Sequence, residues 1–307
     1  MSNENQTFDM IILGGGPAGL TAAIYGGRGG YSVLVLERML PGGEITLTEN
    51  LDNYPGFPEG TSGPEFGQDL EKQARRFGAQ IKTAEVKEVN LQDNPKKIVT
   101  SKETYYAKKV IVSTGTEPRS LGVPGEDELK GKGISFCASC DAAFFKDKEV
   151  AVVGGGDAAV EEALFLTRFA QKVYIIHRRN QLRAVKALEE GMKSNPRIQF
   201  LGNTVVREIK GEGKVEGLQL VDGEREYHLP VQGIFIYIGR LPFTDLLQGQ
   251  LETDKNGYLI TDEEMRTSAP GVFAAGDVRH KVFRQVVTAA SDGAIAAYTA
   301  SRELQIP

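Results

Sequence analysis

The residues best suited to chemistry are two cysteines, Cys137 and Cys140, in the stretch "FCASCDAAFF", followed at once by Asp141. They are the only cysteines in 307 residues. Their spacing suits a redox dithiol, because a ring through the two sulfurs closes with little strain. Asp141 adds a group that can move protons, and reducing a disulfide makes two thiolates, one of which must leave as a thiol. We therefore predict that Cys137, Cys140 and Asp141 are catalytic.

Two other interpretations of the pair stay open from the residues alone. A zinc site needs about four ligands. Beyond the cysteines the chain has only three scattered histidines, His177, His228 and His280, so we predict no metal site. The cysteines could also be buried and unreactive. The stretch "DAAFF" is expected to open a helix, and a helix N-terminus lowers the pKa of a thiol, which favours the redox interpretation.

Two copies of one strand–turn–helix pattern are expected to position this chemistry. Residues 8–27, "FDMIILGGGPAGLTAAIYGG", predict a strand, a glycine turn and a helix, and "YSVLVLER" predicts the next strand. Residues 148–170, "KEVAVVGGGDAAVEEALFLTRFA", repeat the plan before the strand "KVYIIHRR". Short runs of β-branched residues are typical of buried parallel strands. Gly26 and Gly27 fall late in the first helix and should weaken it by up to roughly 1 kcal/mol each.

The first glycine turn has the pattern of a dinucleotide site. Gly14, Gly16 and Gly19 form G-x-G-x-x-G between strand and helix, and Glu37 ends the next strand. The first glycine permits the turn, the second lets a pyrophosphate approach, and the third lets the helix pack on the strand. The helix N-terminus favours phosphate, and Glu37 would accept hydrogen bonds from a ribose. The alternative is a tight packing turn with a surface glutamate.

The second glycine turn differs at the acidic position. Gly154, Gly156 and Ala159 repeat the pattern, but His177 stands where the first turn has its glutamate. Three arginines lie close by, at Arg178, Arg179 and Arg183. A missing carboxylate and added guanidinium groups suit a 2′-phosphate, which favours NADP over NAD. A solvated basic turn is the alternative.

The two turns and the cysteines together predict an electron path. A carrier must accept a hydride from the nicotinamide and pass the electrons to the cysteine sulfurs, and a flavin does this. We therefore predict FAD in the first site and NADPH in the second. The fold expected is α/β, with two Rossmann-like dinucleotide-binding domains. Residues 1–116 and 244–307 are expected to form the FAD domain, and the inserted residues 117–243 the NADPH domain that carries the C-x-x-C pair.

Composition limits the partners. The formal charge is −5, with 40% apolar and 25% charged residues, and a nucleic-acid binder would need a basic face. The polar start "MSNENQTFDM" has no positive n-region, and the apolar run after it is broken by Gly and Pro. We therefore expect no nucleic-acid partner, no membrane span and a cytoplasmic location, where thiols stay reduced.

The chain also resembles the low-molecular-weight thioredoxin reductases of bacteria, in the pyridine nucleotide-disulfide oxidoreductase family. The motifs "GGGPAGLTAAIY", "NYPGF", "CASCD", "VVGGGDAAVEEA", "HRRNQLRA" and "GVFAAGDV...RQVVTAASDG" carry the resemblance across essentially the whole chain. It implies a homodimeric FAD enzyme that passes electrons from NADPH to thioredoxin through a redox-active disulfide. By the same resemblance Cys140 would face the flavin, Cys137 would attack thioredoxin, and Asp141 would be the acid.

The resemblance extends the cofactor-binding set. Asp277 would hold the ribityl or phosphate part of FAD, Asn53 would lie near the ring, and Arg284, Gln285 and Val286 would begin a helix facing the flavin pyrimidine edge. The set is completed by Pro17, Ala18, Arg38, Gly43, Glu44, Asp157, Ala158 and Gly276. Three residues depart from the family pattern, namely Glu44 for the usual Gln, Ala142 for a frequent Gly, and Asn180 for the usual Asp. An ionised Glu44 beside a flavin would oppose its reduction unless it is turned away, paired or protonated.

Other functions share most of these features. A flavin-dependent disulfide reductase could serve a glutaredoxin-like protein or a peroxidase system, although the flavoprotein of alkyl hydroperoxide reductase carries an extra N-terminal region. A reductase fed by ferredoxin would lack the second glycine turn and the arginines, which are present here. A flavin- or nucleotide-binding redox sensor would not turn over.

Overall fold

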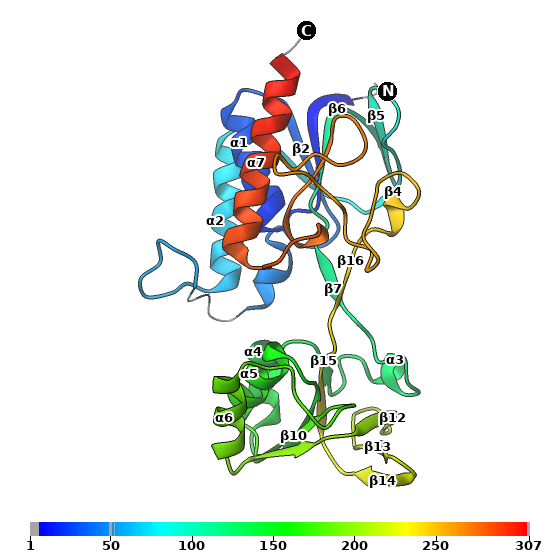
Figure 1. Cartoon of the computed structure of the whole chain (residues 1–307). Coiled ribbons are helices and arrows are strands. Elements are labelled where there is room, and N and C mark those ends of the chain that lie inside the picture. Colours follow the sequence, from blue (N-terminus) through cyan, green and yellow to red (C-terminus); the bar gives the residue numbers. More distant parts are fainter. Residues whose placement is uncertain (1–5, 49–50, 52, 306–307) are drawn as a thin grey trace. The chain divides into compact units, whose positions relative to one another are not determined.

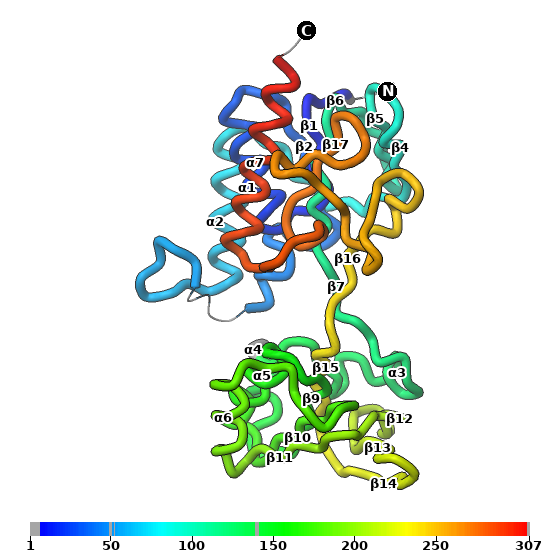
Figure 2. Tube along the Cα trace, viewed as in Figure 1, coloured from blue at the N-terminus to red at the C-terminus, as the bar shows by residue number. Residues whose placement is uncertain are grey.

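The chain forms two compact units, one of them inserted in the other. The computed structural model describes residues 6–48, 51 and 53–305, with only the backbone of Gln6, Ser139 and Cys140. The first unit is Met1–Glu117 with Leu241–Pro307, and the second is Pro118–Arg240. In Figure 2 both the blue and the red ends of the chain belong to one unit, and the green-to-yellow middle forms the other. The predicted α/β fold with two Rossmann-like units is confirmed.

The first unit is a sheet with helices packed along it (Figure 1). Its strands and helices run in the order β1 Gln6–Leu13, α1 Pro17–Arg28, β2 Val33–Glu37, η1 Gly43–Leu47, α2 Gly63–Arg76, β3 Gln80–Thr83, β4 Val86–Asn90, β5 Lys96–Thr100, β6 Thr104–Val112, η3 Asp245–Leu247, β17 Val272–Ala274, η4 Gly276–Val278 and α7 Val286–Gln305.

The order of strands in this sheet creates a binding edge. The order is β3-β2-β1-β6-β5-β4, and β17 pairs with β6. From β1 the chain winds outward through β2 and β3, then returns to the other side of β1 as β6, and these pairs are parallel. The carboxyl ends of β1 and β6 therefore border a topological switch point, where open α/β sheets bind ligands. The glycine turn after β1 lies at this edge.

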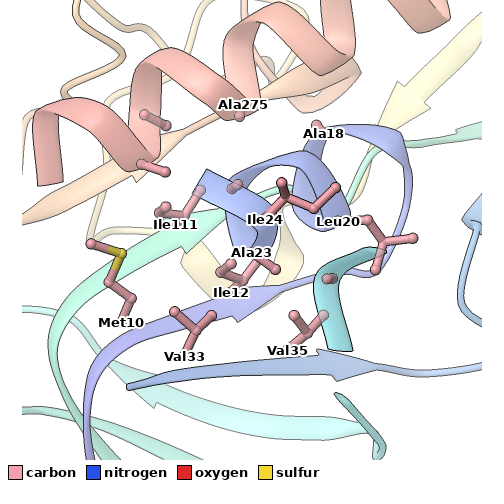
Figure 3. Close-up of a cluster of buried hydrophobic side chains, with 14 of the residues drawn as sticks. Met10, Ile12, Ala18, Leu20, Ala23, Ile24, Val33, Val35, Ile111 and Ala275 are labelled. Carbon is pink, nitrogen blue, oxygen red and sulfur yellow. The ribbon is translucent and has the colours of Figure 1, made fainter. Parts of the chain in front are cut away.

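Helix α1 packs its apolar face on the sheet. Figure 3 shows Ala23 of α1 beside Ile12 of β1, and Ile24 and Val33 belong to the same cluster of buried side chains. Burying each large aliphatic side chain contributes about 1.5–3 kcal/mol. The C-terminal helix α7 packs beside α1, and its alanines join the same cluster. The C-terminal helix therefore shares the hydrophobic core of the first unit.

The second unit repeats the plan around its own sheet. Its elements are α3 Glu126–Leu129, β8 Ile134–Ser135, α4 Ala138–Asp141, η2 Ala142–Phe145, β9 Glu149–Gly154, α5 Asp157–Leu166, β10 Lys172–Ile176, α6 Lys186–Ser194, β11 Ile198–Leu201, β12 Thr204–Lys210, β13 Gly217–Asp222, β14 Arg225–Leu229 and β15 Gly233–Tyr237.

The parallel sheet of this unit has the order β11-β10-β9-β15-β8, so its switch point lies between β9 and β15. Strands β12, β13 and β14 form a separate antiparallel sheet. Between the units the chain passes twice, through the paired strands β7 Thr116–Pro118 and β16 Arg240–Pro242. In the described ranges, no helix has both the length and the apolar character that a membrane crossing requires.

Candidate active site

The first glycine turn uses each of its three glycines differently. Gly14 has φ +102°, and a Cβ there would lie 2.4 Å from the Ser113 carbonyl oxygen. A Cβ on Gly19 would lie 2.0 Å from the Gly14 oxygen, so this glycine is needed for helix-on-strand packing. A Cβ on Gly16 would meet only the Gly42 oxygen, at 4.0 Å. Protein packing alone therefore does not require glycine at position 16, which fits close approach of a ligand.

Glu37 turns its carboxylate toward this turn. The residue ends β2, and its Oε2 accepts a hydrogen bond from the Gly15 N–H at 2.6 Å. Its Oε1 accepts from the Met39 N–H at 2.8 Å. Gly16 is the N-cap of α1, where the described residues supply no side-chain cap, so the first N–H groups of the helix stay available to an anion. The predicted acid, the glycines and the helix start are therefore assembled at one edge.

Asp277 brings a second carboxylate from the far end of the sequence. It lies on η4, directly after β17, whose parallel partner β6 pairs with β1. Its Oδ1 is buried and accepts no hydrogen bond from the described residues, although Lys281 Nζ lies 3.4 Å away. A buried acceptor without a partner is costly unless a ligand supplies the donor. The hydroxyl groups of a ribityl chain are donors of this kind.

A small network fixes the segment before α7. Asn53 donates from its amide nitrogen to Gln285 Oε1 at 3.1 Å. The guanidinium of Arg284 lies 4.0 Å from the centre of the Tyr258 ring, and its Nε donates to the Asp277 carbonyl oxygen at 3.4 Å. Helix α7 begins at Val286, so Arg284 and Gln285, which were expected to begin it, lie just before its first residue. Asn53 is thus held near the start of the same helix as Asp277, Arg284 and Gln285.

The other predicted residues of the first unit lie around the same turn. Pro17 and Ala18 occupy the first turn of α1, Gly43 and Glu44 begin η1, and the Glu44 side chain is exposed. A cavity of about 460 Å³ adjoins the end of β2 and is lined by Arg38, Lys82–Glu85, Thr100–Glu103 and Tyr105.

The second glycine turn is built like the first, but the atoms that its glycines approach are different. A Cβ on Gly154 would lie 2.5 Å from the Tyr237 oxygen, whereas one on Gly156 would meet nothing within 4 Å. A Cβ on Gly155 would lie 2.5 Å from the ring of His177, which packs against the turn. Gly156 caps α5 without a side-chain bond from the described residues, and Asp157, Ala158 and Ala159 open the helix. This turn therefore also presents a bare helix start.

His177 is kept neutral in this turn. Burial lowers its pKa, and the positive charges of Arg183, Arg178 and Arg179 lower that pKa further. Its Nε2 is buried and has no hydrogen-bond partner within the described ranges. Such a nitrogen is open to a donor or acceptor on a ligand.

The arginines around His177 are free to bind an anion. All three are exposed, and the described part of the chain gives none of them an ion pair. Two hydrogen bonds donated by backbone N–H groups hold their loop against the turn. The Arg183 N–H donates to the Gly155 oxygen at 2.6 Å, and the Val185 N–H donates to Asp157 Oδ1 at 2.8 Å. Positive charge is thereby fixed where a carboxylate stands in the first unit.

Cys137 is partly buried and disulfide-bonded. It is the N-cap of α4, and Cys140, the only other cysteine of the chain, lies within that helix; the Cys140 side chain is outside the described residues. Asp141 ends α4, with its N–H donating to the Cys137 oxygen at 3.3 Å. The expectation that "DAAFF" opens a helix is wrong, because the helix begins at Ala138, and Ala142–Phe145 form a 3-10 turn.

Sequence reasoning missed several residues that support these sites. Ser113 Oγ donates to the Gly14 oxygen at 2.9 Å, and Lys281 bridges Asp277 to the buried Asp292, at 3.4 Å and 3.1 Å. A buried acid in an alanine-rich helix such as α7 is a signal that could have drawn attention to Asp292. Tyr237, whose hydroxyl accepts from the Ala138 N–H at 2.8 Å, gives no comparable signal in the sequence.

Comparison with known proteins defines the class to which these sites belong. The sequence profile of the family described as "Pyridine nucleotide-disulphide oxidoreductase" matches residues 8–293. The chain therefore belongs to that family.

Within the family, the similarity is to thioredoxin reductases. Thioredoxin reductase of Listeria monocytogenes is 46% identical over 309 residues, covering 99% of this chain and 96% of the relative. Thioredoxin reductase of Bacillus subtilis is 47% identical over 299 residues, which cover 96% of this chain and 94% of the relative. The crystal structure of Lactococcus lactis thioredoxin reductase (FR conformation) superposes with a TM-score of 0.88 at 41% identity, covering 96% of this chain and 98% of that one. The resemblance found in the sequence is confirmed, and the chain is placed among the thioredoxin reductases.

Proposed function

We propose that this chain passes electrons from NADPH, by way of FAD, to its Cys137–Cys140 disulfide, and from the resulting dithiol to the disulfide of thioredoxin. The observation that carries the proposal is in the second unit. A disulfide-bonded Cys137 shares that unit with a glycine turn whose acid is replaced by His177 and arginines. A nucleotide site and a redox pair in one unit need a carrier, which the first unit has the residues to hold.

FAD would be held in the first unit by Gly14–Gly19, Glu37 and Asp277. The open space at Gly16 fits a pyrophosphate, and Asp277 Oδ1, which pairs with Lys281 but accepts no hydrogen bond from the described residues, fits a sugar-like chain. The cavity beside Arg38 would take the adenosine end. When bound, FAD would supply the ability to accept a hydride from a nicotinamide and to pass the electrons to a disulfide, which no side chain of this unit can do. Asn53 and Gln285 would orient the ring from the start of α7.

NADPH would bind at the second turn. Gly156 and the start of α5 would accept the pyrophosphate, and Arg178, Arg179 and Arg183 would bind the 2′-phosphate. The unpartnered Nε2 of His177 would then hydrogen-bond to the ribose that carries this phosphate. Because the pKa of His177 is lowered and its ring is neutral, NADPH binding would not bury a charge on this side chain.

The dithiol step follows thiol–disulfide exchange. The Cys137 thiolate attacks one sulfur of the thioredoxin disulfide, forming a mixed disulfide, and the thioredoxin thiolate that leaves takes a proton. Cys140 then attacks Cys137, which restores the Cys137–Cys140 disulfide and releases the second thioredoxin thiolate. Asp141, next to Cys140, is the group placed to supply and receive the proton.

Flavin content and nucleotide preference test the proposal. The purified protein should show flavin absorbance and should be reduced by NADPH faster than by NADH, and it should not accept electrons from reduced ferredoxin. A colourless protein that takes up no FAD on reconstitution would refute it. We further propose a cytoplasmic homodimer, for which light scattering should give twice the 33.4 kDa of the chain.

A further inference from the structure

The start of the cysteine helix is held on both sides by hydroxyl groups. The Cys137 N–H donates to Ser135 Oγ at 3.1 Å, and that hydroxyl donates to the Cys137 oxygen, also at 3.1 Å. The next N–H, of the fully buried Ala138, donates to the Tyr237 hydroxyl at 2.8 Å. Ser135 is local in sequence, but Tyr237 comes from a different strand. The backbone of Cys137 is therefore tied to the centre of the sheet.

Glu162 completes this connection from α5. Its carboxylate accepts a hydrogen bond from the Tyr237 hydroxyl. Burial, and then the negative charge of Glu161, raise the pKa of Glu162 to about 6, whereas the bond from Tyr237 opposes that rise. Burial and the charge of Glu162 raise the pKa of Tyr237, with Asp141 also contributing. The carboxylates of Glu162 and Asp141 therefore both act on the Tyr237 hydroxyl that holds the residue after Cys137.

The position of the pair links two parts of the second unit. Tyr237 ends β15 and pairs with Gly154 of the second glycine turn, at the switch point of the sheet. Glu162 lies on the helix that this turn opens. One hydrogen-bonded chain thus runs from the nucleotide-binding helix, through Tyr237, to the residue after Cys137. Side chains whose pKa is shifted by burial together with a specific partner are more frequent at functional sites than elsewhere.

We propose that Tyr237 and Glu162 are positioning residues that set the thiol–disulfide equilibrium of the Cys137 pair. The inference rests on the proposed role of that pair as the redox centre. The hydrogen bond from the Ala138 N–H to the Tyr237 hydroxyl is made while Cys137 is disulfide-bonded. Removing the hydroxyl should therefore destabilise the disulfide form. The Glu162 charge opposes formation of a nearby thiolate, so its loss should favour the dithiol form as well.

The same unit offers a matched control. The Tyr174 hydroxyl donates to Glu149 Oε2 at 2.7 Å, again between a tyrosine and a glutamate of the parallel sheet. Glu149 begins β9, so this second pair lies at the opposite end of the strand from Gly154. Tyr174→Phe therefore removes a comparable hydrogen bond without touching the start of α4.

Equilibration of the FAD-loaded protein with buffers of reduced and oxidised dithiothreitol tests the proposal. In this exchange the protein disulfide is reduced as dithiothreitol is oxidised to its cyclic disulfide, and alkylation counts the protein thiols. We expect Tyr237→Phe and Glu162→Gln each to shift the equilibrium toward the dithiol by about threefold or more, or about 14 mV for two electrons. Alkylation near neutral pH should also be about threefold faster in Glu162→Gln, because the thiol pKa falls.

Tyr174→Phe should leave both readouts at the native value. Glu162→Gln keeps a hydrogen-bond acceptor for Tyr237, so this variant remains informative if Tyr237→Phe fails to fold. Shifts smaller than threefold in Glu162→Gln, or shifts toward the disulfide, would overturn the inference. Failure of the proposed function would look different, since thioredoxin reduction would then survive Cys137→Ser whatever the dithiothreitol equilibrium shows.

Discussion

Alanine in place of both Arg178 and Arg179 should weaken NADPH and leave NADH almost unchanged. Both side chains are exposed, and the described residues give neither an ion pair, so their removal leaves no orphaned partner in the free protein. What is lost is the contact with the 2′-phosphate, which NADH lacks. The effect should therefore be confined to one of the two nucleotides.

The size of the effect follows from the strength of such contacts. A hydrogen bond to a charged group contributes about 1.5–3 kcal/mol. Each factor of ten in affinity corresponds to about 1.4 kcal/mol, so the KM for NADPH should rise roughly ten- to a hundredfold. Removal of the two positive charges should also raise the pKa of His177, because both arginines now lower it. The protonation of His177 then becomes a second, independent readout by NMR.

Steady-state kinetics with each nucleotide provide the assay. Arg207→Ala is the matched control, because Arg207 is an arginine of the same unit that pairs with Glu226 in the antiparallel sheet, with 3.4 Å between Nη1 and Oε1. It should leave both KM values at the native level. An unchanged KM for NADPH in the double variant, or an equal loss for NADH, would refute the assignment of the 2′-phosphate site.

Three further predictions concern the partly buried acids Glu162 and Asp277 and the two cysteines. In the folded protein the pKa of Glu162 is about 6, above its ordinary value of 4.5, so the free energy of unfolding of the native protein should fall as the pH rises from 4.5 through 6. Glu162→Gln should therefore raise the free energy of unfolding in urea by about 1 kcal/mol near pH 8 and leave it unchanged near pH 4. A variant with the same pH profile as the native protein would contradict this. Cys137→Ser should show a long-wavelength charge-transfer band from a Cys140 thiolate beside oxidised flavin, whereas Cys140→Ser should lack it and trap thioredoxin as a mixed disulfide on a non-reducing gel; a band only in Cys140→Ser would exchange the two roles. Asp277→Asn should bind FAD about tenfold more weakly, because a charged hydrogen-bond acceptor is removed, and should therefore lose FAD more readily on dialysis. If the variant retained FAD as the native protein does, a contact between Asp277 and FAD would be excluded.

The sequence predicted the features that depend on local patterning. A strand, a glycine turn and a helix occupy few residues in sequence, so both turns could be located from spacing alone. The replacement of an acid by His177 and arginines was equally visible. The fold class followed, because two βαβ patterns with β-branched strands leave few alternatives.

Contacts between distant segments gave no such signal. The bond between Tyr237 and Ala138 joins residues 99 apart, and neither residue type is unusual in its element. Gly27, which looked only destabilising, has a packing reason, since a Cβ there would lie 2.5 Å from the Phe77 carbonyl oxygen. The early start of the cysteine helix was also missed. Propensity favoured "DAAFF", but the tertiary bonds to Cys137 and Ala138 begin the helix before it.

Thioredoxin-dependent oxidation of NADPH, measured by the loss of NADPH absorbance with the FAD-loaded protein, tests the electron path most directly. The native protein should oxidise NADPH only when oxidised thioredoxin is present, with formation of one thioredoxin dithiol for each NADPH consumed. The variant with both Cys137→Ser and Cys140→Ser should retain FAD and its reduction by NADPH, yet form no thioredoxin dithiol. Thioredoxin reduction at the native rate in that variant, or its absence in the native protein, would contradict the proposed path.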